Sequence, residues 1–194
     1  MANTIPLNYE LQFEPLFHNF TFNCIEIITI SSPKATNSIT LDAAEIKIKK
    51  CHVEQGTRII SAKTSLNEKN ERLTIKLAKK IKGKAKLCIR FTGILNDRLL
   101  GFYKSQYKDN KGKIKYLATT QFEAADARRA FPCWDEPAVK ATFDVSLLVN
   151  RHHDAISNMS VISKKNVDSK ILYKFGRTPI MSTYLLYLGV GEFE

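Results

Sequence analysis

The feature that most constrains the fold is an alternation of apolar and polar residues with a period of two. It is clearest over residues 84–91 and recurs over residues 143–149. Successive side chains of a β-strand point to opposite faces, so this period predicts strands with one buried face. Further strands are expected at residues 9–13, 20–30, 38–41, 46–53, 73–77, 114–122, 170–175 and 181–190. Phe20 and Phe22 are out of phase with Ile25 and Ile27, which indicates either a bulge or a strand buried on both sides.

Turn-forming segments separate these runs, and helical periodicity is almost absent. The turns are expected at residues 31–33, 54–56, 67–70 and 109–112. Many short strands spaced about every ten residues predict an all-β fold, an antiparallel sandwich or saddle. One short helical turn is expected at residues 126–130, with Asp126 as its cap and Pro132 as its stop. No repeat or linker divides the chain, so we expect a single domain over residues 1–194.

Charge and hydropathy limit the partners. The formal net charge is +11, from 30 Lys and Arg against 19 Asp and Glu. Most of the excess is lysine interleaved with apolar strand residues, without the arginine and aromatic mixture of a nucleic-acid groove, so no nucleic-acid partner is expected. No apolar run reaches the roughly 18 residues of a membrane span, and residues 1–9 lack a signal sequence. We therefore expect a cytoplasmic chain without a membrane partner.

The four cysteines are far apart and without paired spacing. Cys24, Cys51, Cys88 and Cys133 fit neither a disulfide framework nor a zinc ribbon. Reduced thiols are the expected state.

The segment from Thr120 to Pro137, TQFEAADARRAFPCWDEP, differs from the rest of the chain. It gathers acidic residues, two arginines and the only tryptophan, which a plain sandwich does not need. Here the sequence resembles the N-terminal domain of the zinc aminopeptidases related to aminopeptidase N and puromycin-sensitive aminopeptidase. Matching motifs lie at residues 101–105, 155–159 and 178–185, and at Pro6 and Tyr9. The stretch at residues 184–191 most resembles the archaeal tricorn-interacting factors of that family.

The resemblance implies an enzyme in which this domain packs on a thermolysin-like catalytic domain, its expected partner. The family binds zinc through His-Glu-x-x-His with a distant Glu and anchors substrate with Gly-x-Met-Glu-Asn, and neither motif occurs here. His152 and His153 are adjacent, so they cannot present two ligands one helical turn apart, and His18 and His52 stand alone. We expect zinc only in the full-length enzyme, with no metal bound and no catalytic residue in this chain.

Recognition of a free peptide N-terminus is the task that the resemblance leaves to this domain. The α-amine is cationic near neutral pH, and a fixed carboxylate distinguishes it from the interior of a peptide. The resemblance assigns this role to Glu123 and makes Gln121 part of the pocket for the first side chain. A charge-assisted hydrogen bond of this kind contributes roughly 1.5–3 kcal/mol. The resemblance also implies a cis peptide bond between Glu123 and Ala124.

Structural interpretations of the same residues stay open. Glu123 can be an ion-pair partner of Arg128 or Arg129, and Gln121 an amide that satisfies the backbone. Structural ion pairs are expected to hold the loop through Arg128, Arg129, Asp135 and Glu136. A buried hydrophobic plug, with an unreactive thiol, is expected from Phe131, Pro132, Cys133 and Trp134.

Two functions remain after these arguments. The preferred one is the amine-recognising N-terminal domain of a zinc aminopeptidase that removes N-terminal residues from peptide substrates. The alternative is a free-standing, non-catalytic β-sandwich that binds another protein. On the first interpretation, an apolar patch is expected around Trp134 and the strand of Gln121, where the catalytic domain would dock.

Overall fold

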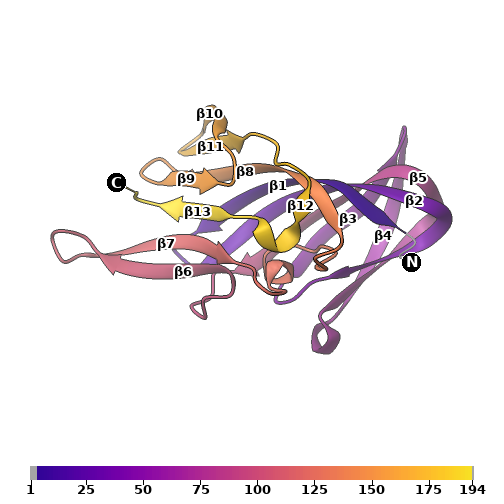
Figure 1. Cartoon of the computed structure of the whole chain (residues 1–194), viewed down its shortest axis with the longest axis horizontal. Coiled ribbons are helices and arrows are strands. Elements are labelled where there is room, and N and C mark those ends of the chain that lie inside the picture. Colours follow the sequence, from indigo (N-terminus) through magenta and orange to yellow (C-terminus); the bar gives the residue numbers. More distant parts are fainter. Residues whose placement is uncertain (1–3, 194) are drawn as a thin grey trace.

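The computed structural model describes residues 4–193 as two mostly antiparallel β-sheets (Figure 1). Residues 1–3, at the start of the segment expected to lack a signal, and residue 194 lie outside the described part. The larger sheet has the strand order β10-β11-β8-β1-β2-β5-β3-β4, with β12 paired to β8. Its strands are β1 (Ile5–Leu16), β2 (Thr21–Asp42), β3 (Lys47–Gln55), β4 (Arg58–Asn67), β5 (Arg72–Ile94), β8 (Lys140–Asn150), β10 (Val161–Val167), β11 (Lys170–Phe175) and β12 (Met181–Ser182).

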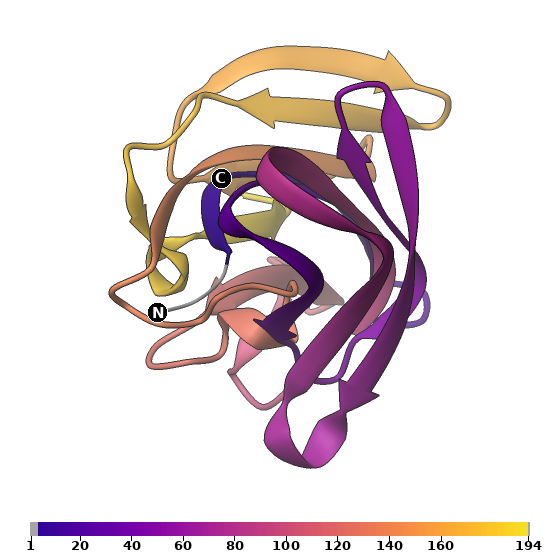
Figure 2. The same ribbon diagram turned by 90° about the vertical axis from the view of Figure 1, so that its right-hand side faces the viewer.

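The smaller sheet has the order β6-β7-β13-β9. Its strands are β6 (Gly101–Lys108), β7 (Ile114–Gln121), β9 (Asp154–Ser157) and β13 (Leu188–Gly191). Figure 2 shows the long strands of the larger sheet twisting and curving strongly, which gives this sheet its saddle shape. All-β architecture is therefore confirmed, and the parallel pairing of β1 with β8 departs from the expected antiparallel arrangement.

Aromatic side chains fill the space between the two sheets. Phe13 on β1, Phe22 on β2 and Phe102 on β6 are fully buried, and their ring centroids lie 5.4–5.7 Å apart. Tyr9 stacks on Phe143 with 5.0 Å between centroids. Because these residues come from both sheets, the core ties the small sheet to the large one.

Several strands are longer or shorter than the sequence predicts. The runs at 20–30 and 38–41 belong to one strand, β2, and those at 73–77 and 85–91 to another, β5. The expected strand at 181–190 is interrupted by the 3-10 turn η3 (Thr183–Leu185). Both interpretations of residues 20–27 are wrong, because β2 pairs without a register shift over residues 21–28 and Ile25 is 38% exposed on the outer face.

The helical content of the described residues is limited to three 3-10 turns. Besides η3 these are η1 (Glu68–Asn70) and η2 (Ala127–Arg129), and η2 confirms the predicted turn. The expected cap is wrong, since Asp126 makes no side-chain cap hydrogen bond and its Oδ1 instead accepts from Nε of Arg129 at 2.8 Å. Among residues 4–193 we find no helix that is long and apolar enough to cross a bilayer.

Candidate functional site

The segment singled out by the sequence begins where β7 ends. Gln121, opposite Gly101 of β6, is the last residue of the strand, and the alternation continues for two more residues. Phe122 is buried, with its ring centroid 6.1 Å from that of Phe131, while Gln121 and Glu123 on either side of it are exposed. The core therefore anchors the backbone between the two polar side chains and leaves both facing solvent.

The peptide bond between Glu123 and Ala124 is cis, which confirms the expectation. The chain then turns back into η2, and the amide of Asp126 donates to the carbonyl of Phe122 at 3.0 Å. Gly101 makes this close return possible. Its φ is +69°, and a Cβ at this position would lie 2.7 Å from Cβ of Arg129.

The two arginines of the loop are fully engaged with other acids. Arg128 donates from Nε to Oδ2 of Asp135 at 3.0 Å and from Nη1 to Oε2 of Glu71 at 3.2 Å. Burial would lower the pKa of Arg128, but the hydrogen bond to Asp135 and the nearby carboxylates outweigh it and raise the pKa above the ordinary value. Arg128 and Asp135 therefore confirm the expected structural ion pairs.

Arg129 binds a second set of carboxylates. It donates from Nε to Asp126 at 2.8 Å, from Nη1 to Glu45 at 2.7 Å and from Nη2 to Glu71 at 2.9 Å. Both arginines thus reach Glu71, which joins their two ion-pair groups into one network. The expected role of Glu136 is wrong, because it is exposed and forms no ion pair within the described part of the chain.

Glu123 lies outside this network. Its carboxylate forms no hydrogen bond or ion pair with any residue between 4 and 193, and the nearby arginines are occupied. The interpretation of Glu123 as an ion-pair partner of Arg128 or Arg129 is therefore wrong. What remains is an exposed acid on a well-anchored turn, free to accept hydrogen bonds from a cation in solution.

The expected hydrophobic plug is confirmed. Phe131 and Cys133 are fully buried, Trp134 is 8% exposed, and Pro132 is buried as well. Burial and the neighbouring Asp135 raise the pKa of the Cys133 thiol well above its ordinary value, which fits an unreactive side chain. All four cysteines are free thiols.

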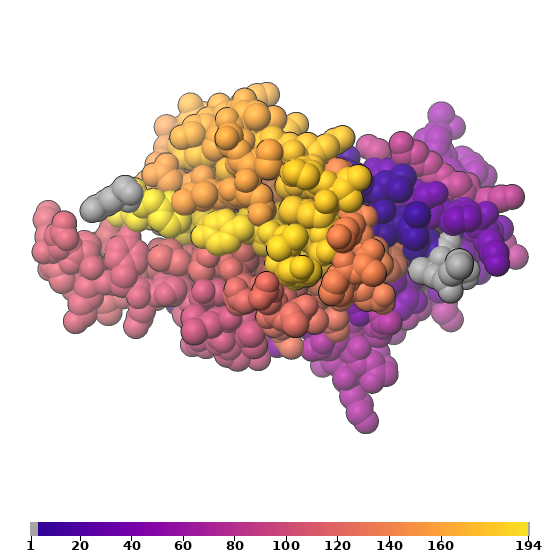
Figure 3. Space-filling model, viewed as in Figure 1, coloured from indigo at the N-terminus to yellow at the C-terminus, as the bar shows by residue number. Residues whose placement is uncertain are grey.

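The exposed face of the small sheet adjoins Gln121. Thr119 shares this face with Gln121 because they are two residues apart on β7, and the register aligns Thr119 with Gly189 and Ile156. Tyr187 adds its ring, since its hydroxyl lies 3.1 Å from Oγ1 of Thr119. Figure 3 shows β13 as a yellow band between the orange and pink segments that flank it.

Large apolar side chains are exposed on and near this face. They include Ile156 at 43%, Leu185 at 47% and Tyr187 at 37% exposure. The expected patch is therefore found on β9, η3 and the segment before β13, beside the strand of Gln121, and the expectation is wrong for Trp134, which is buried.

The residues present do not fit the zinc centre of the resembled enzymes. None of the described 3-10 turns could present two histidines one α-helical turn apart. Within residues 4–193, mixed donors gather at two other places, His52 with Glu54 and Cys88, and His152 with His153 and Glu192. The expectation that His52 stands alone is thus wrong, since its Nε2 lies 3.3 Å from Oε1 of Glu54.

The fold and this loop define an all-β domain built around an aromatic core, with an unpaired acid presented beside an exposed sheet face. The chain belongs to the Peptidase M1 N-terminal domain family, whose model matches residues 5–185. It is 41% identical to the puromycin-sensitive aminopeptidase of Caenorhabditis elegans, over 97% of this chain and 20% of that protein. It is 40% identical to aminopeptidase 2 of Candida albicans (98% and 21%) and 37% identical to aminopeptidase M1 of Arabidopsis thaliana (98% and 22%).

The chain thus spans about a fifth of the length of the curated relatives that it matches. These relatives are named as aminopeptidases, which are hydrolases, and the resemblance seen in the sequence is confirmed at the level of the family.

Proposed function

We propose that this chain is the N-terminal, substrate-recognising domain of a zinc-dependent aminopeptidase, in which Glu123 binds the free α-amine of a peptide and Gln121 borders the first side chain. The observation that carries the proposal is the exposed, unpaired carboxylate of Glu123 beside two arginines that are engaged elsewhere within the described residues. A structural acid at this place would be expected to pair with one of them.

The exposed face of the small sheet is the proposed contact with the catalytic domain. Its apolar residues Ile156, Leu185 and Tyr187 adjoin the strand of Gln121, so a domain docked there would close a pocket over Gln121 and Glu123. Zinc would be held by that second domain, because the donors found in this chain do not fit the family's motif. The 194 residues form one domain in this proposal, and the enzyme works in the cytoplasm on peptides, without nucleic-acid or membrane partners. A relation to the tricorn-interacting factors is supported by the stretch at residues 184–191 alone.

The test is kinetic and uses the longer enzyme that contains this domain. Replacing Glu123→Gln keeps the shape of the side chain and removes its charge. A lost charge-assisted hydrogen bond of about 1.5–3 kcal/mol corresponds to a roughly ten- to hundred-fold lower kcat/KM on a free aminoacyl amide. Hydrolysis of an N-acetylated amide, already slow, should not change, and Glu136→Gln serves as the matched exposed control. Equal kcat/KM values for the wild type and Glu123→Gln would refute the amine assignment.

The reading frame after Glu194 distinguishes the proposed enzyme domain from the alternative function, a free-standing protein-binding module. An open frame that continues into Gly-x-Met-Glu-Asn and His-Glu-x-x-His supports the enzyme, whereas a stop codon at that point favours the module.

A further inference from the structure

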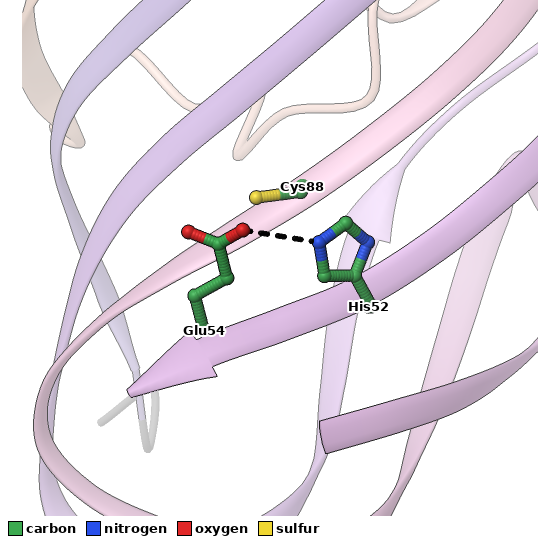
Figure 4. A group of neighbouring side chains, drawn as sticks. All are labelled: His52, Glu54 and Cys88. Atoms are coloured by element: carbon green, nitrogen blue, oxygen red, sulfur yellow. Dashed lines mark hydrogen bonds and ion pairs between the residues drawn. The ribbon is translucent and has the colours of Figure 1, made fainter. Parts of the chain in front are cut away.

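A group of three potential metal ligands lies on the outer face of the large sheet (Figure 4). His52 and Glu54 are two residues apart on β3 and so share a face, and His52 is directly opposite Cys88 of β5. On the other side of the same two strands, Val53 and Leu87 are fully buried in the core. The backbone that positions the three ligands is therefore held by core packing.

The ligand atoms are close enough to share one ion. Nε2 of His52 lies 3.3 Å from Oε1 of Glu54, and all three ligand atoms lie within 4.8 Å of one another. Zinc bonds of about 2.0 Å to nitrogen or oxygen and about 2.3 Å to sulfur place neighbouring ligands of a tetrahedral ion roughly 3.3–3.7 Å apart. Small rotations of the Glu54 and Cys88 side chains would reach these distances.

The site is partly shielded and has room for a further ligand. The side chain of His52 is 24% exposed, and Cys88 is half-buried. Beside them lies a cavity of about 190 Å³, which is also lined by Ile25, Ile27, Lys50 and Arg90. Within the described residues neither of these two cations forms an ion pair with Glu54, so its carboxylate is open to a metal ion.

The three side chains lie against one another on this face. Figure 4 shows the sulfur of Cys88 pointing toward the carboxylate of Glu54, which is also in contact with the ring of His52. A divalent ion would displace the thiol proton to solvent and leave a thiolate bound to the metal.

The second group of donors is less suited to a cation. Nζ of Lys115 lies 2.7 Å and 2.9 Å from the two oxygens of Glu192, beside His152 and His153. An ammonium group therefore already occupies the position at which a metal ion would have to bind.

We propose that His52, Glu54 and Cys88 bind a divalent transition-metal ion of the zinc class, with a fourth position open toward the cavity. Thiolate and imidazole ligands select zinc or cobalt over magnesium or calcium. Nδ1 of His52 is buried without a partner in the described part of the chain, so no neighbouring group orients the ring. A hydrogen bond that orients the ring of a metal-binding histidine is worth about 10–100-fold in metal affinity. Because His52 lacks this hydrogen bond, the site should bind the ion correspondingly more weakly.

The test is a titration of the purified, reduced 194-residue chain with Co²⁺. The wild type should show a thiolate-to-cobalt charge-transfer band that saturates at one ion per chain and disappears when Zn²⁺ is added. Cys88→Ser should abolish the band, and His52→Gln and Glu54→Gln should each weaken binding at least tenfold. Cys51→Ser, which changes the adjacent thiol, and His152→Gln, which changes the second donor group, should keep the band.

The same ion should raise the urea midpoint of the wild type but not that of Cys88→Ser, whose folding is checked by near-ultraviolet circular dichroism. The proposal is overturned if the wild type shows no charge-transfer band. It is equally overturned if the band persists in Cys88→Ser or is lost in Cys51→Ser or His152→Gln. None of these readouts depends on peptidase activity, so their outcome is independent of the proposed function.

Discussion

Two regions of the molecule contain buried acids, and they handle them in opposite ways. In the loop after β7, the side chain of Asp135 is 1% exposed, and its oxygens accept from Nε of Arg128 at 3.0 Å and from the hydroxyl of Thr183 at 2.9 Å. On the inner face of β2, Glu26 is fully buried, and neither of its oxygens has a hydrogen-bond partner among residues 4–193. The first acid is paired; the second is isolated.

The surroundings of Glu26 explain how the fold accommodates it. The titratable groups that interact with it are Tyr9, Cys24, Cys51 and Cys133, none of which is a cation. Burial raises the pKa of Glu26 well above its ordinary value, which favours the uncharged form of the carboxyl group in the folded state. The fold thus gives buried Asp135 a cation and a hydroxyl donor, whereas the apolar surroundings of Glu26 favour its uncharged form. Glu123 differs from both of these buried acids, because it is exposed to solvent and unpaired among the described residues.

The largest loss of stability is expected when the ion pair between Arg128 and Asp135 is removed. Arg128→Ala removes the guanidinium from Asp135 and leaves its carboxylate buried without a cation. Removal of one partner of a buried ion pair costs about 3–5 kcal/mol in the free energy of unfolding. Urea denaturation followed by tryptophan fluorescence measures it, since Trp134 lies in the adjacent plug.

The matched control for this change is Arg177→Ala. Arg177 pairs with Asp144, but its side chain is 62% exposed, so its loss should leave the urea midpoint almost unchanged. If Arg128→Ala is no more destabilising than the control, pairing in the loop does not stabilise the fold.

Removal of the isolated acid should have the opposite sign. Glu26→Met replaces the buried carboxyl with an apolar side chain of similar size. Burial of a polar group without a partner costs about 1–3 kcal/mol, so the free energy of unfolding at pH 7 should rise by about that amount. Glu14→Met, which removes an acid paired with Asn23 and Lys170, should instead lower it. A destabilised Glu26→Met protein would show that Glu26 has a partner that stabilises it.

The buried carboxyl of Glu26 should also make the stability of the protein depend on pH. The folded pKa of Glu26 is raised, so between the unfolded value of about 4.3 and the folded value the native state holds a proton that the unfolded state has lost. Stability should therefore fall as the pH rises above about 4.3, by at most about 1.4 kcal/mol per pH unit. The Glu26→Gln variant lacks this group. Denaturation curves from pH 5 to 8 should show a difference between the two proteins that grows with pH, and a constant difference would contradict the assignment.

Most of the strands that the sequence predicts have one face in the core, although β6, which places Phe102 there, was not predicted. β8 is the clearest, because its alternating residues Phe143, Val145, Leu147 and Val149 are buried. β10 was not predicted, and none of its residues is buried; in β4, which was also missed, only Ile60 is buried. These strands lie at the edges of the large sheet, where backbone pairing holds them. Because their side chains are not packed in the core, their sequences lack the alternation of apolar and polar residues that predicts a strand.

The two candidate sites also differ in how much of them the sequence could show. The sequence singled out Gln121 and Glu123 through the resemblance of their segment to the aminopeptidase family, although nothing in the sequence showed that Arg128 and Arg129 would find other partners at distant positions in the chain. The proximity of His52 to Cys88 depends on the register between β3 and β5, which the turns and core packing set together. His52 and Glu54 alone, two residues apart, gave only a weak signal.

The smallest change in stability is expected for Glu123→Gln, and it tests whether Glu123 belongs to the ion-pair network of the loop. Because its carboxylate is exposed and unpaired in the described part of the chain, Glu123→Gln should change the free energy of unfolding by no more than about 0.5 kcal/mol. Urea denaturation of the two proteins side by side measures this difference. A loss as large as that of Arg128→Ala would place Glu123 in the structural network and remove the reason to assign it to substrate. If Glu123→Gln leaves the free energy of unfolding almost unchanged but lowers kcat/KM on free-amine substrates tenfold or more, Glu123 recognises the peptide and is distinct from the residues that hold the loop.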